Sequence, residues 1–346
     1  MKTAFVTGAC GFVGIHLANQ LLDNGWKVHA FDRTSAKADR LKARGAVFVE
    51  GSITDADAVA AALPEKAEAV FHVAGNTSLW GRNNAAQTKD NVEGTRTMVR
   101  AALSKKIGRF VYTSSFAVYG FHDTVVSEDM QRRADTSKIN YFISKFFAEQ
   151  EVKKGVEQGL DAVILNPANI MGPHDVRNWA QLFLMIENEK LPGAPPGKAS
   201  FCHVREAARA HIAAFENGRT GHNYLLGGAD TTYLELIRKI ALVHGRKAPK
   251  KTTPAWLLRA VARLADGASY FTGKEPDVTP EKVEFFSNTL LCSSQKAIDE
   301  LRYRPATIDE MIADTRRWLI AEGLLGGTAK QDADKTDLRP RERGAS

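Results

Sequence analysis

The first half of the chain alternates short runs of apolar, β-branched and aromatic residues with longer segments in which apolar residues recur every three or four positions. The short runs are typical of buried strands, and the longer spacing places apolar side chains on one face of a helix. Between the first two runs, Val13, Leu17 and Leu21 recur at helical spacing and Asn24-Gly25 supplies a C-terminal stop. Strands are therefore predicted at residues 4–6, 28–31, 46–49, 69–73, 110–112 and 162–165.

Strands and helices that alternate along a chain usually form parallel strands joined by right-handed crossovers. The first half therefore predicts an α/β fold with a doubly wound parallel sheet. After Pro167 this rhythm changes, because residues 191–197 read as a Pro- and Gly-rich loop and the later segments are mostly helical. This second part is expected to form a smaller lobe that caps the strand ends.

The chain is expected to divide into a sheet domain, a second lobe and a tail. The sheet domain is expected at residues 1–171, with 206–228 returning to it, the lobe at 172–205 and 229–325, and the tail at 326–346. The tail mixes charged residues with Gly, Pro and Ser and lacks apolar periodicity, so it is predicted to be disordered.

The 346 residues carry a net charge of +7, but the basic residues are scattered, so no nucleic-acid partner is expected. Cys10, Cys202 and Cys292 show no paired spacing for a disulfide framework or a metal site, which fits a reducing cytoplasm. Gly8 comes too soon for a signal-peptide core, and no apolar run approaches the roughly 18 residues of a membrane span. We therefore expect a cytoplasmic protein without a metal site or an integral membrane segment.

Three glycines follow the first predicted strand, in the segment Gly8-Ala-Cys-Gly11-Phe-Val-Gly14. Gly8 permits a sharp turn, Gly11 lets the backbone approach a pyrophosphate, and Gly14 lets the helix pack closely on the sheet. The N-terminus of the next helix then offers N–H groups and the positive end of its dipole to the anion. A turn of this kind between a buried strand and an amphipathic helix predicts a dinucleotide site.

Asp32 ends the second predicted strand, where its carboxylate can accept hydrogen bonds from the adenosine ribose. A 2′-phosphate there would be repelled by about 4 kcal/mol at about 4 Å and an effective dielectric constant near about 20. Arg33 follows directly and could offset this repulsion by stacking on adenine or pairing with the phosphate. NAD is therefore the expected cofactor, with NADP as the alternative. Ser52 and Ile53, after the third strand, are expected to line the adenine pocket.

Tyr141 and Lys145 stand one helical turn apart in the sequence, so they share a helix face. A free phenol has a pKa near about 10, and a neighbouring ammonium group favours the phenolate and lowers that pKa. Tyr141 is thereby suited to exchange a proton with a carbonyl or hydroxyl oxygen. Upstream, Ser114 and Ser115 follow an apolar strand and complete a possible set of catalytic groups.

Taken together, these residues resemble the extended short-chain dehydrogenase/reductase family, the NAD-dependent epimerases and dehydratases, up to about Leu325. The motifs that carry the resemblance are Thr7-Gly8-x-x-Gly11-Phe12-x-Gly14, Phe71-His72-Val73-Ala74-Gly75, Asn91-Val92-x-Gly94-Thr95, Tyr112-Thr-Ser-Ser115-x-Ala-Val-Tyr-Gly120, Tyr141-x-x-x-Lys145 and Asn166-Pro167. Residues 71–80 and 201–204 look most like the branch of dihydroflavonol reductases, 3β-hydroxysteroid dehydrogenases and hopanoid-associated epimerases. The resemblance implies a Rossmann-type dinucleotide domain.

The chain departs from the family pattern at two places. Ser52 stands where many members carry an aspartate that contacts the adenine amine. Ala199-Ser200 lacks the arginine that nucleotide-sugar members often place before the position of Phe201. The second departure counts against a nucleotide-sugar substrate.

The resemblance also implies a Ser-Tyr-Lys triad. Tyr141 would exchange a proton with the substrate oxygen while hydride moves to or from nicotinamide, and Lys145 would lower the pKa of Tyr141 and hold a ribose hydroxyl. Ser115, aligned in preference to Ser114, would donate a hydrogen bond to the substrate oxygen. Asn91 begins a helix and would anchor the active-site backbone or cap that helix. Further cofactor contacts are implied for Phe12, Val13, Val73, Ala74, Gly75, Thr113, Asn166, Pro167 and Ile170.

Substrate contacts are expected from Asn76, Trp80, Ser115, Phe116 and Trp179. Apolar walls with few polar groups suit a ring-containing or aliphatic carbonyl compound. Residues 254–264 carry an apolar stripe at helical spacing, which fits a lid, a membrane-surface helix or packing against the lobe, the last being favoured.

The leading prediction is an NAD(P)-dependent reductase of ketones or aldehydes that also oxidises the alcohol. The nearest rival is a sugar epimerase or dehydratase, which uses the same triad and retains its NAD. A non-catalytic dinucleotide-sensing protein is the rival from another class, and the complete set of Ser115, Tyr141 and Lys145 argues against it. Long helices around residues 91–104 and 141–154 could pair across an axis, as in relatives, so a homodimer is expected.

Overall fold

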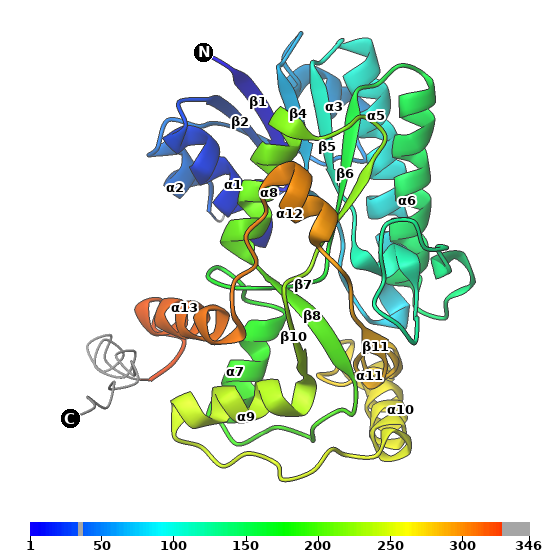
Figure 1. The fold of residues 1–346 in the computed structure, drawn as a ribbon, viewed down its shortest axis with the longest axis vertical. Helices are drawn as coiled ribbons and strands as arrows, with labels where there is room; N and C mark the ends of the chain where they lie inside the picture. The colour runs from blue at the N-terminus through cyan, green and yellow to red at the C-terminus, as the bar shows by residue number, and fades with distance from the viewer. Residues whose placement is uncertain (34–36, 327–346) are drawn as a thin grey trace, which may run out of the picture.

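The computed structural model describes residues 1–33 and 37–326. A seven-stranded parallel sheet with the order β3-β2-β1-β4-β5-β6-β9 forms its larger half (Figure 1). The strands are β1 Thr3–Thr7, β2 Lys27–Asp32, β3 Val47–Glu50, β4 Ala69–His72, β5 Arg109–Thr113, β6 Ala162–Pro167 and β9 Asn223–Leu226. The predicted doubly wound Rossmann-type sheet is confirmed. Apart from Gly326, the predicted tail lies outside the described residues.

Alternate residues of the central strands enter two cores, one on each face of the sheet. Ala4 and Val6 belong to the core on one face, whereas Phe5 belongs to the core on the other face. Strands buried on both faces explain why the sequence shows near-continuous apolar runs rather than polar alternation. The helices of the first face are α1 Phe12–Asp23, α2 Ala38–Lys42, α8 Val204–Asn217 and α12 Gln295–Leu301, and those of the second are α3 Ala56–Ala62, α5 Gly94–Ser104 and α6 Asn140–Glu157.

The smaller half contains a second sheet, where the sequence predicted only occasional strands among helices. β8 (Lys198–His203) pairs antiparallel with β10 (Ala229–Thr232) and parallel with β7 (Asn169–Met171) and β11 (Thr289–Leu290). The helices of this half are α7 Trp179–Glu187, α9 Tyr233–His244, α10 Ala255–Thr272, α11 Pro280–Ser287 and α13 Ile308–Ala321. Figure 1 shows them below the carboxyl ends of the large sheet. Within the described part of the chain, no helix is both long enough and apolar enough to cross a membrane.

The helices α5 and α6 approach each other closely at Gly155 of α6. A Cβ atom added to this glycine would lie 2.7 Å from Val99 Cγ1 of α5 and 3.1 Å from Leu160 Cδ2. By contrast, a Cβ atom added to Gly267, an exposed glycine of α10, would meet no atom within 4 Å. The two helical glycines therefore separate the effect of packing from that of helix propensity.

Gly155→Ala is expected to lower the free energy of unfolding by about 1–3 kcal/mol, because overpacking costs more than the gain in helix propensity. Gly267→Ala, the matched control, should raise it by about 0.5–1 kcal/mol, since only the propensity changes. Urea unfolding of both variants measures the difference. A gain in stability for Gly155→Ala would contradict the close approach of α5 and α6.

Candidate active site

The candidate site lies at the carboxyl ends of the strands in the large sheet. The strand order reverses between β1 and β4, and ligands of open α/β sheets bind in the crevice at such a reversal. The turn that follows β1 contains the predicted glycines, and residues 73–76 follow β4. Ser115 follows β5 across the same edge, and Tyr141 lies in the first turn of α6.

The glycine turn is built so that no side chain fits along it. Gly8 has a φ of +67°, and a Cβ atom there would lie 2.8 Å from the Cα atom of Ala74 in the segment after β4. A Cβ atom on Gly14 would collide with the carbonyl oxygen of Gly8. Gly11 caps α1 without a side-chain hydrogen bond, so Phe12 and Val13 begin the helix with their N–H groups directed at the turn. This cradle fits the pyrophosphate of a dinucleotide.

The carboxylate of Asp32 lies beneath the glycine turn. Its Oδ2 atom accepts the N–H of Cys10 at 2.9 Å, which fixes the end of β2 against the turn. The Arg33 side chain, 62% exposed, lies with Nη1 3.3 Å from Asp90 Oδ1. The residues at the expected ribose position are thus an oriented carboxylate and an arginine held by a second carboxylate.

The two residues expected to line the adenine pocket differ in their surroundings. Ser52 Oγ forms a hydrogen bond with Thr54 Oγ1 at 2.8 Å. Ile53 is buried, and a Cβ atom on Gly94 of α5 would lie 2.5 Å from its Cδ1. The Ile53 side chain therefore supports α5, and its contact with adenine stays a prediction.

Asn91 anchors the segment that follows β4. Its Oδ1 atom accepts the N–H of Asn76 at 2.7 Å, and its Nδ2 atom donates to Asn76 O and to Ser144 Oγ, both at 3.0 Å. The prediction that Asn91 begins or caps a helix is wrong, because it lies within the π-helical turn Lys89–Glu93 between α4 (Asn84–Thr88) and α5. Such turns are rare and are frequently found at functional sites. The amide is free to bind the β4 segment because it is not needed as a cap.

Gly75 brings this segment beside the lysine. A Cβ atom on Gly75 would lie 3.4 Å from Asn91 Oδ1 and 3.8 Å from Lys145 Nζ. Val73 and Ala74 precede it, and the N–H of Ala74 donates to Thr7 Oγ1 at 3.2 Å. The segment after β4 is therefore fixed between the glycine turn and α6.

The two adjacent serines after β5 have different partners. Ser114 Oγ donates to the buried carboxylate of Glu149 at 2.7 Å. Ser115 Oγ accepts the N–H of Ala117 at 3.1 Å and lies beside the phenol of Tyr141, whose pKa it lowers. Ser115, and not Ser114, therefore adjoins the phenol.

The expectation that Lys145 lowers the pKa of Tyr141 is wrong. Burial raises the pKa of Tyr141, and the opposing contribution comes from the hydrogen bond with Ser115. Lys145 Nζ instead donates to Thr113 O at 2.7 Å and to Tyr112 OH at 3.1 Å. Because Lys145 is buried, its own pKa is lowered to about 7, although the charge of Glu149 acts in the opposite direction.

Glu149 is a site residue that the sequence analysis missed. It is fully buried on α6, one turn after Lys145, and its Oε2 atom accepts Ser114 Oγ and Asn166 Nδ2. Its Oε1 atom lies 3.2 Å from Arg132 Nε and 3.3 Å from Lys153 Nζ. The available signal was an acidic residue at i+4 from Lys145 on an inward helix face.

The other residues after β5 and β6 that were predicted to contact the cofactor mostly bond to other parts of the protein. Asn166 Nδ2 also donates to Ser115 O at 3.1 Å, and Thr113 Oγ1 is hydrogen-bonded to His211 Nε2 at 2.7 Å. Pro167 ends β6 beside Leu226 of β9, and Ile170 lies in β7. These residues hold the carboxyl edge, and their cofactor contacts stay predictions.

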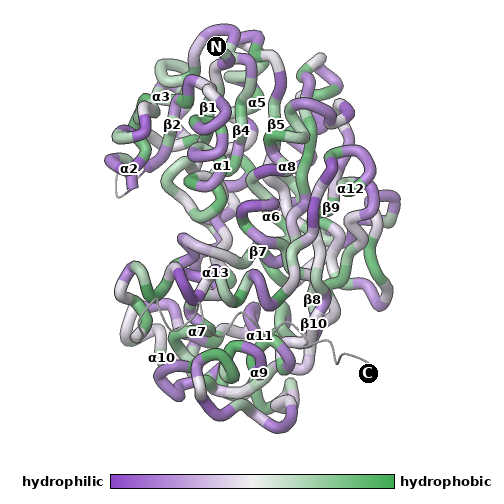
Figure 2. Tube along the Cα trace, turned by 60° about the vertical axis from the view of Figure 1, so that its left-hand side comes forward, coloured by the Kyte–Doolittle hydropathy of each residue, from purple (hydrophilic) through white to green (hydrophobic). Residues whose placement is uncertain are grey.

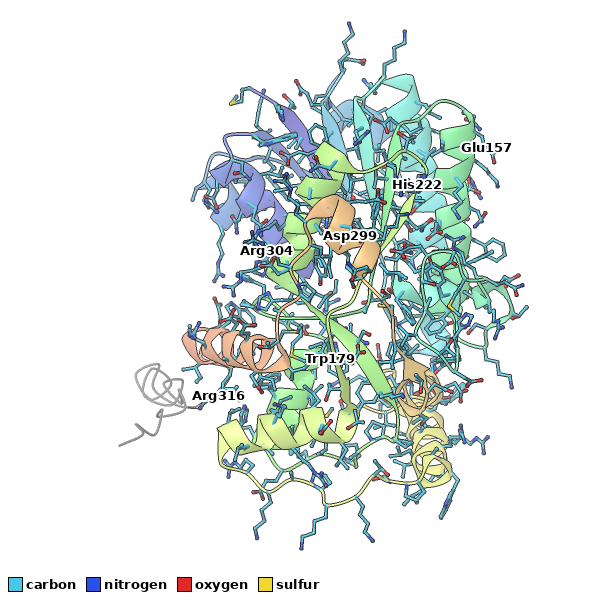
Figure 3. All side chains as sticks on the ribbon, viewed as in Figure 1. Glu157, Trp179, His222, Asp299, Arg304 and Arg316 are labelled. Carbon is cyan, nitrogen blue, oxygen red and sulfur yellow. The ribbon has the colours of Figure 1, made fainter. Side chains whose placement is uncertain are left out.

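The residues expected to contact substrate are spread over two environments. Asn76 lies beside Asn91 at the carboxyl edge, and Trp80 Nε1 donates to Asp266 Oδ1 of α10 at 3.1 Å. Trp179 is stacked on Tyr233 with ring centroids 5.9 Å apart, within the smaller half of the molecule (Figure 3). Phe116 is stacked on Tyr119 at 6.2 Å and belongs to the same buried core as Trp179. Trp179 and Phe116 thus contribute mainly to this core.

Several known proteins are similar to this chain over most of its length. "Putative dihydroflavonol 4-reductase" of Synechocystis sp. is 30% identical over 329 residues, covering 93% of this chain and 95% of that protein. "3-beta-hydroxysteroid dehydrogenase" of Mycolicibacterium neoaurum is 29% identical, covering 89% of each chain. "4-hydroxy-2-methyl-3-oxo-4-farnesyl-3,4-dihydroquinoline-1-oxide ketoreductase" of Stigmatella aurantiaca is 28% identical, covering 77% of this chain and 80% of that protein.

Solved structures share the fold over nearly the whole chain. The crystal structure of gox2253 has a TM-score of 0.80 and 29% identity, and it covers 94% of this chain and 100% of its own. The Bordetella bronchiseptica enzyme WbmH, solved in complex with NAD+, has a TM-score of 0.73 and 25% identity, covering 93% and 99%. Residues 4–227 match the NAD dependent epimerase/dehydratase family. The resemblance inferred from the motifs is confirmed: the chain belongs to the NAD-dependent epimerase/dehydratase family, the extended short-chain dehydrogenases/reductases, whose cofactor is NAD.

Proposed function

We propose that the protein is an NAD(P)-dependent reductase of a ketone or aldehyde group on a largely apolar small molecule, and that it oxidises the corresponding alcohol in reverse. The observation that carries the proposal is the position of the Ser115 hydroxyl beside the phenol of Tyr141, whose pKa it lowers, at the carboxyl edge of the sheet. The names of the relatives support the substrate class, since they describe a ketoreductase, a hydroxysteroid dehydrogenase and a dihydroflavonol reductase.

The cofactor, when bound, exchanges a hydride with the carbonyl carbon. The hydroxyl of Tyr141 gives its proton to the carbonyl oxygen, so that the carbonyl becomes an alcohol. Tyr141 carries its proton at neutral pH, since burial raises the phenol's pKa, and Ser115 opposes that rise and so favours release of the proton. Ser115 donates a second hydrogen bond to the same oxygen and stabilises the charge that develops there.

Lys145 would hold a hydroxyl of the nicotinamide ribose when the cofactor is bound. The ammonium lies one helical turn from Tyr141 and is oriented by Thr113 and Tyr112. Because the pKa of Lys145 is lowered to about 7, its amine is partly protonated at neutral pH. Asn91 holds the segment of Gly75 and Asn76 beside it and thereby positions the wall of the site.

A sugar epimerase or dehydratase is the alternative within the family, since it would use the same residues. The strand β8 counts against it: Ala199 and Ser200 are fully buried there, and Ser200 Oγ donates to Asp230 Oδ1 at 2.5 Å. A buried Ala-Ser pair offers no cation for a nucleotide diphosphate.

A homodimer through the outer faces of α5 and α6 stays a prediction.

Tyr141→Phe is expected to lower turnover about 10²–10⁴-fold while leaving the dissociation constant of NAD unchanged, because only the proton donor is removed. Nicotinamide absorbance, followed with cyclic and aliphatic ketones, their alcohols and nucleotide sugars, measures turnover, and the native protein is the reference. Near-normal turnover of the variant would exclude Tyr141 as the proton donor. Turnover of nucleotide sugars alone, with NAD retained through gel filtration, would favour the epimerase.

Lys145→Met should remove a pH dependence of stability. In the native protein the lysine pKa is about 7, and in the unfolded chain it is about 10.4, so the unfolded state binds more protons between these values. The native free energy of unfolding therefore rises relative to that of the variant from about pH 7 to about pH 10, by up to about 1.4 kcal/mol per pH unit. Urea unfolding across this range measures it. Parallel curves would show that the lysine is not buried with a lowered pKa.

Glu149→Gln is expected to lower the free energy of unfolding by about 2–4 kcal/mol, because it leaves Arg132 and Lys153 without their buried carboxylate. The matched control is Glu151→Gln on the same helix, whose partners Arg96 and Lys154 are more exposed. Its loss should stay below about 1 kcal/mol. Urea unfolding measures both losses of free energy of unfolding. Equal losses for the two variants would contradict a buried Glu149 that is more strongly stabilised by its partners than Glu151 is.

A further inference from the structure

Large apolar side chains are exposed along one face of α10. Trp256 is 69% exposed, Leu264 77% and Phe271 93%, and Leu257 and Val261 are exposed between them. Leu257, Val261, Leu264 and Phe271 follow one another at spacings of four, three and seven residues, which aligns them along the helix, and Trp256 extends the stripe beside Leu257. The favoured reading of this segment, packing against the lobe, is therefore wrong for this face.

The opposite face of α10 is held by the rest of the protein. Leu258 and Ala262 form a small core with Val283 of α11. Trp80 donates to Asp266, and Arg82 Nη1 donates to Ser269 O at 3.1 Å. Because these contacts fix the rotation of the helix, the apolar stripe is directed to solvent rather than to the protein core.

The position of α10 leaves this face open. Figures 1 and 2 both show the helix at the end of the molecule far from the N-terminus, at the rim of the smaller half. Through Trp80 and Arg82 it is joined to the segment that leaves β4 beside Asn76. The stripe, which we define as residues 256, 257, 261, 264 and 271, is thus outside the candidate active site but connected to it.

The segment of the chain that contains the stripe is rich in basic residues. Residues 246–274 contain one acidic residue, Asp266, which accepts the hydrogen bond of Trp80. Glu275, paired with Lys282, and Asp277 follow the segment directly. The basic residues of this segment are Arg246, Lys247, Lys250, Lys251, Arg259, Arg263 and Lys274. Arg246 pairs with Glu187 and Arg259 with Glu284, and the loop lysines before the helix are exposed.

We propose that the stripe of α10 and its basic surroundings dock the protein on the surface of a bilayer that contains anionic lipids. Trp, Leu and Phe on one face, with Lys and Arg beside them, are typical of helices that lie in the membrane interface. The apolar side chains enter the boundary between headgroups and acyl chains, while the cations meet the anionic headgroups. Arg259, Arg263 and Asp266 within the helix fit an orientation in the membrane plane rather than across it.

The charges favour a membrane over a second copy of this chain. A two-fold symmetric contact through the stripe would set the same basic segment against itself, and like charges placed opposite one another are repelled. An anionic bilayer neutralises those charges and also covers the apolar side chains. The docking does not depend on the proposed reaction, so a failure of either leaves the other intact.

The test uses the full chain and two kinds of vesicle, phosphatidylcholine alone and equal parts of phosphatidylcholine and phosphatidylglycerol. We expect co-sedimentation with the anionic vesicles, weaker co-sedimentation with phosphatidylcholine, and release by high salt. Tryptophan emission should shift to the blue on binding, and Trp256→Phe should remove that shift, because Trp256 is the tryptophan in the stripe.

Leu264→Glu and Phe271→Glu should each lower the partition coefficient for anionic vesicles at least about tenfold, since each removes a large apolar contact. Ile298→Glu, which changes an exposed apolar residue of α12, is the control and should bind as the native protein does. Thermal unfolding checks that the variants stay folded. The proposal would be overturned if the native protein did not bind anionic vesicles, or if the stripe variants and the control bound them equally. It would also be overturned if the native protein formed a dimer in solution and both stripe variants were monomers.

Discussion

The candidate active site depends on one buried carboxylate. Glu149 of α6 is fully buried, and a buried charge is tolerated only where ion pairs and hydrogen bonds replace water. Its partners come from three other places in the chain: Ser114 after β5, Asn166 in β6, and Arg132. These bonds set the height of α6 against the strand ends. Tyr141 belongs to the same helix, so its distance from the sheet follows from them.

The same carboxylate decides which serine adjoins the phenol. Adjacent residues of extended chain point to opposite sides. Because Ser114 is directed to Glu149, Ser115 is directed away from it and lies beside Tyr141, whose pKa it lowers. Asn166, which also donates to Ser115 O, fixes the backbone between them. Chemistry at Tyr141 is therefore supported by residues that touch neither substrate nor cofactor.

The sequence predicted features that depend on local requirements. The strands follow from short apolar runs, and the glycine turn follows from a backbone that tolerates no side chain at Gly8 and Gly14. Features that depend on distant partners were missed or mistaken. The π-helical turn that holds Asn91 exists because the amide binds the segment after β4. The pKa of Tyr141 depends on burial and on Ser115, neither of which the four-residue spacing to Lys145 reveals.

Helix α10 shows a further limit of periodicity. An apolar stripe in a sequence says that one face of a helix is apolar, but it does not say which face the fold buries. Here the buried face is narrow, formed by Leu258 and Ala262, and hydrogen bonds donated by Trp80 and Arg82 hold it in place. The wider face with Trp256 and Leu264 is left in water. The hydrogen bonds of the narrow face thus hold the more apolar face in solvent, although the more apolar face of a helix is usually the buried one. Because the helix is fixed in this rotation, its apolar face can contact the acyl chains of a bilayer without a rearrangement of the fold.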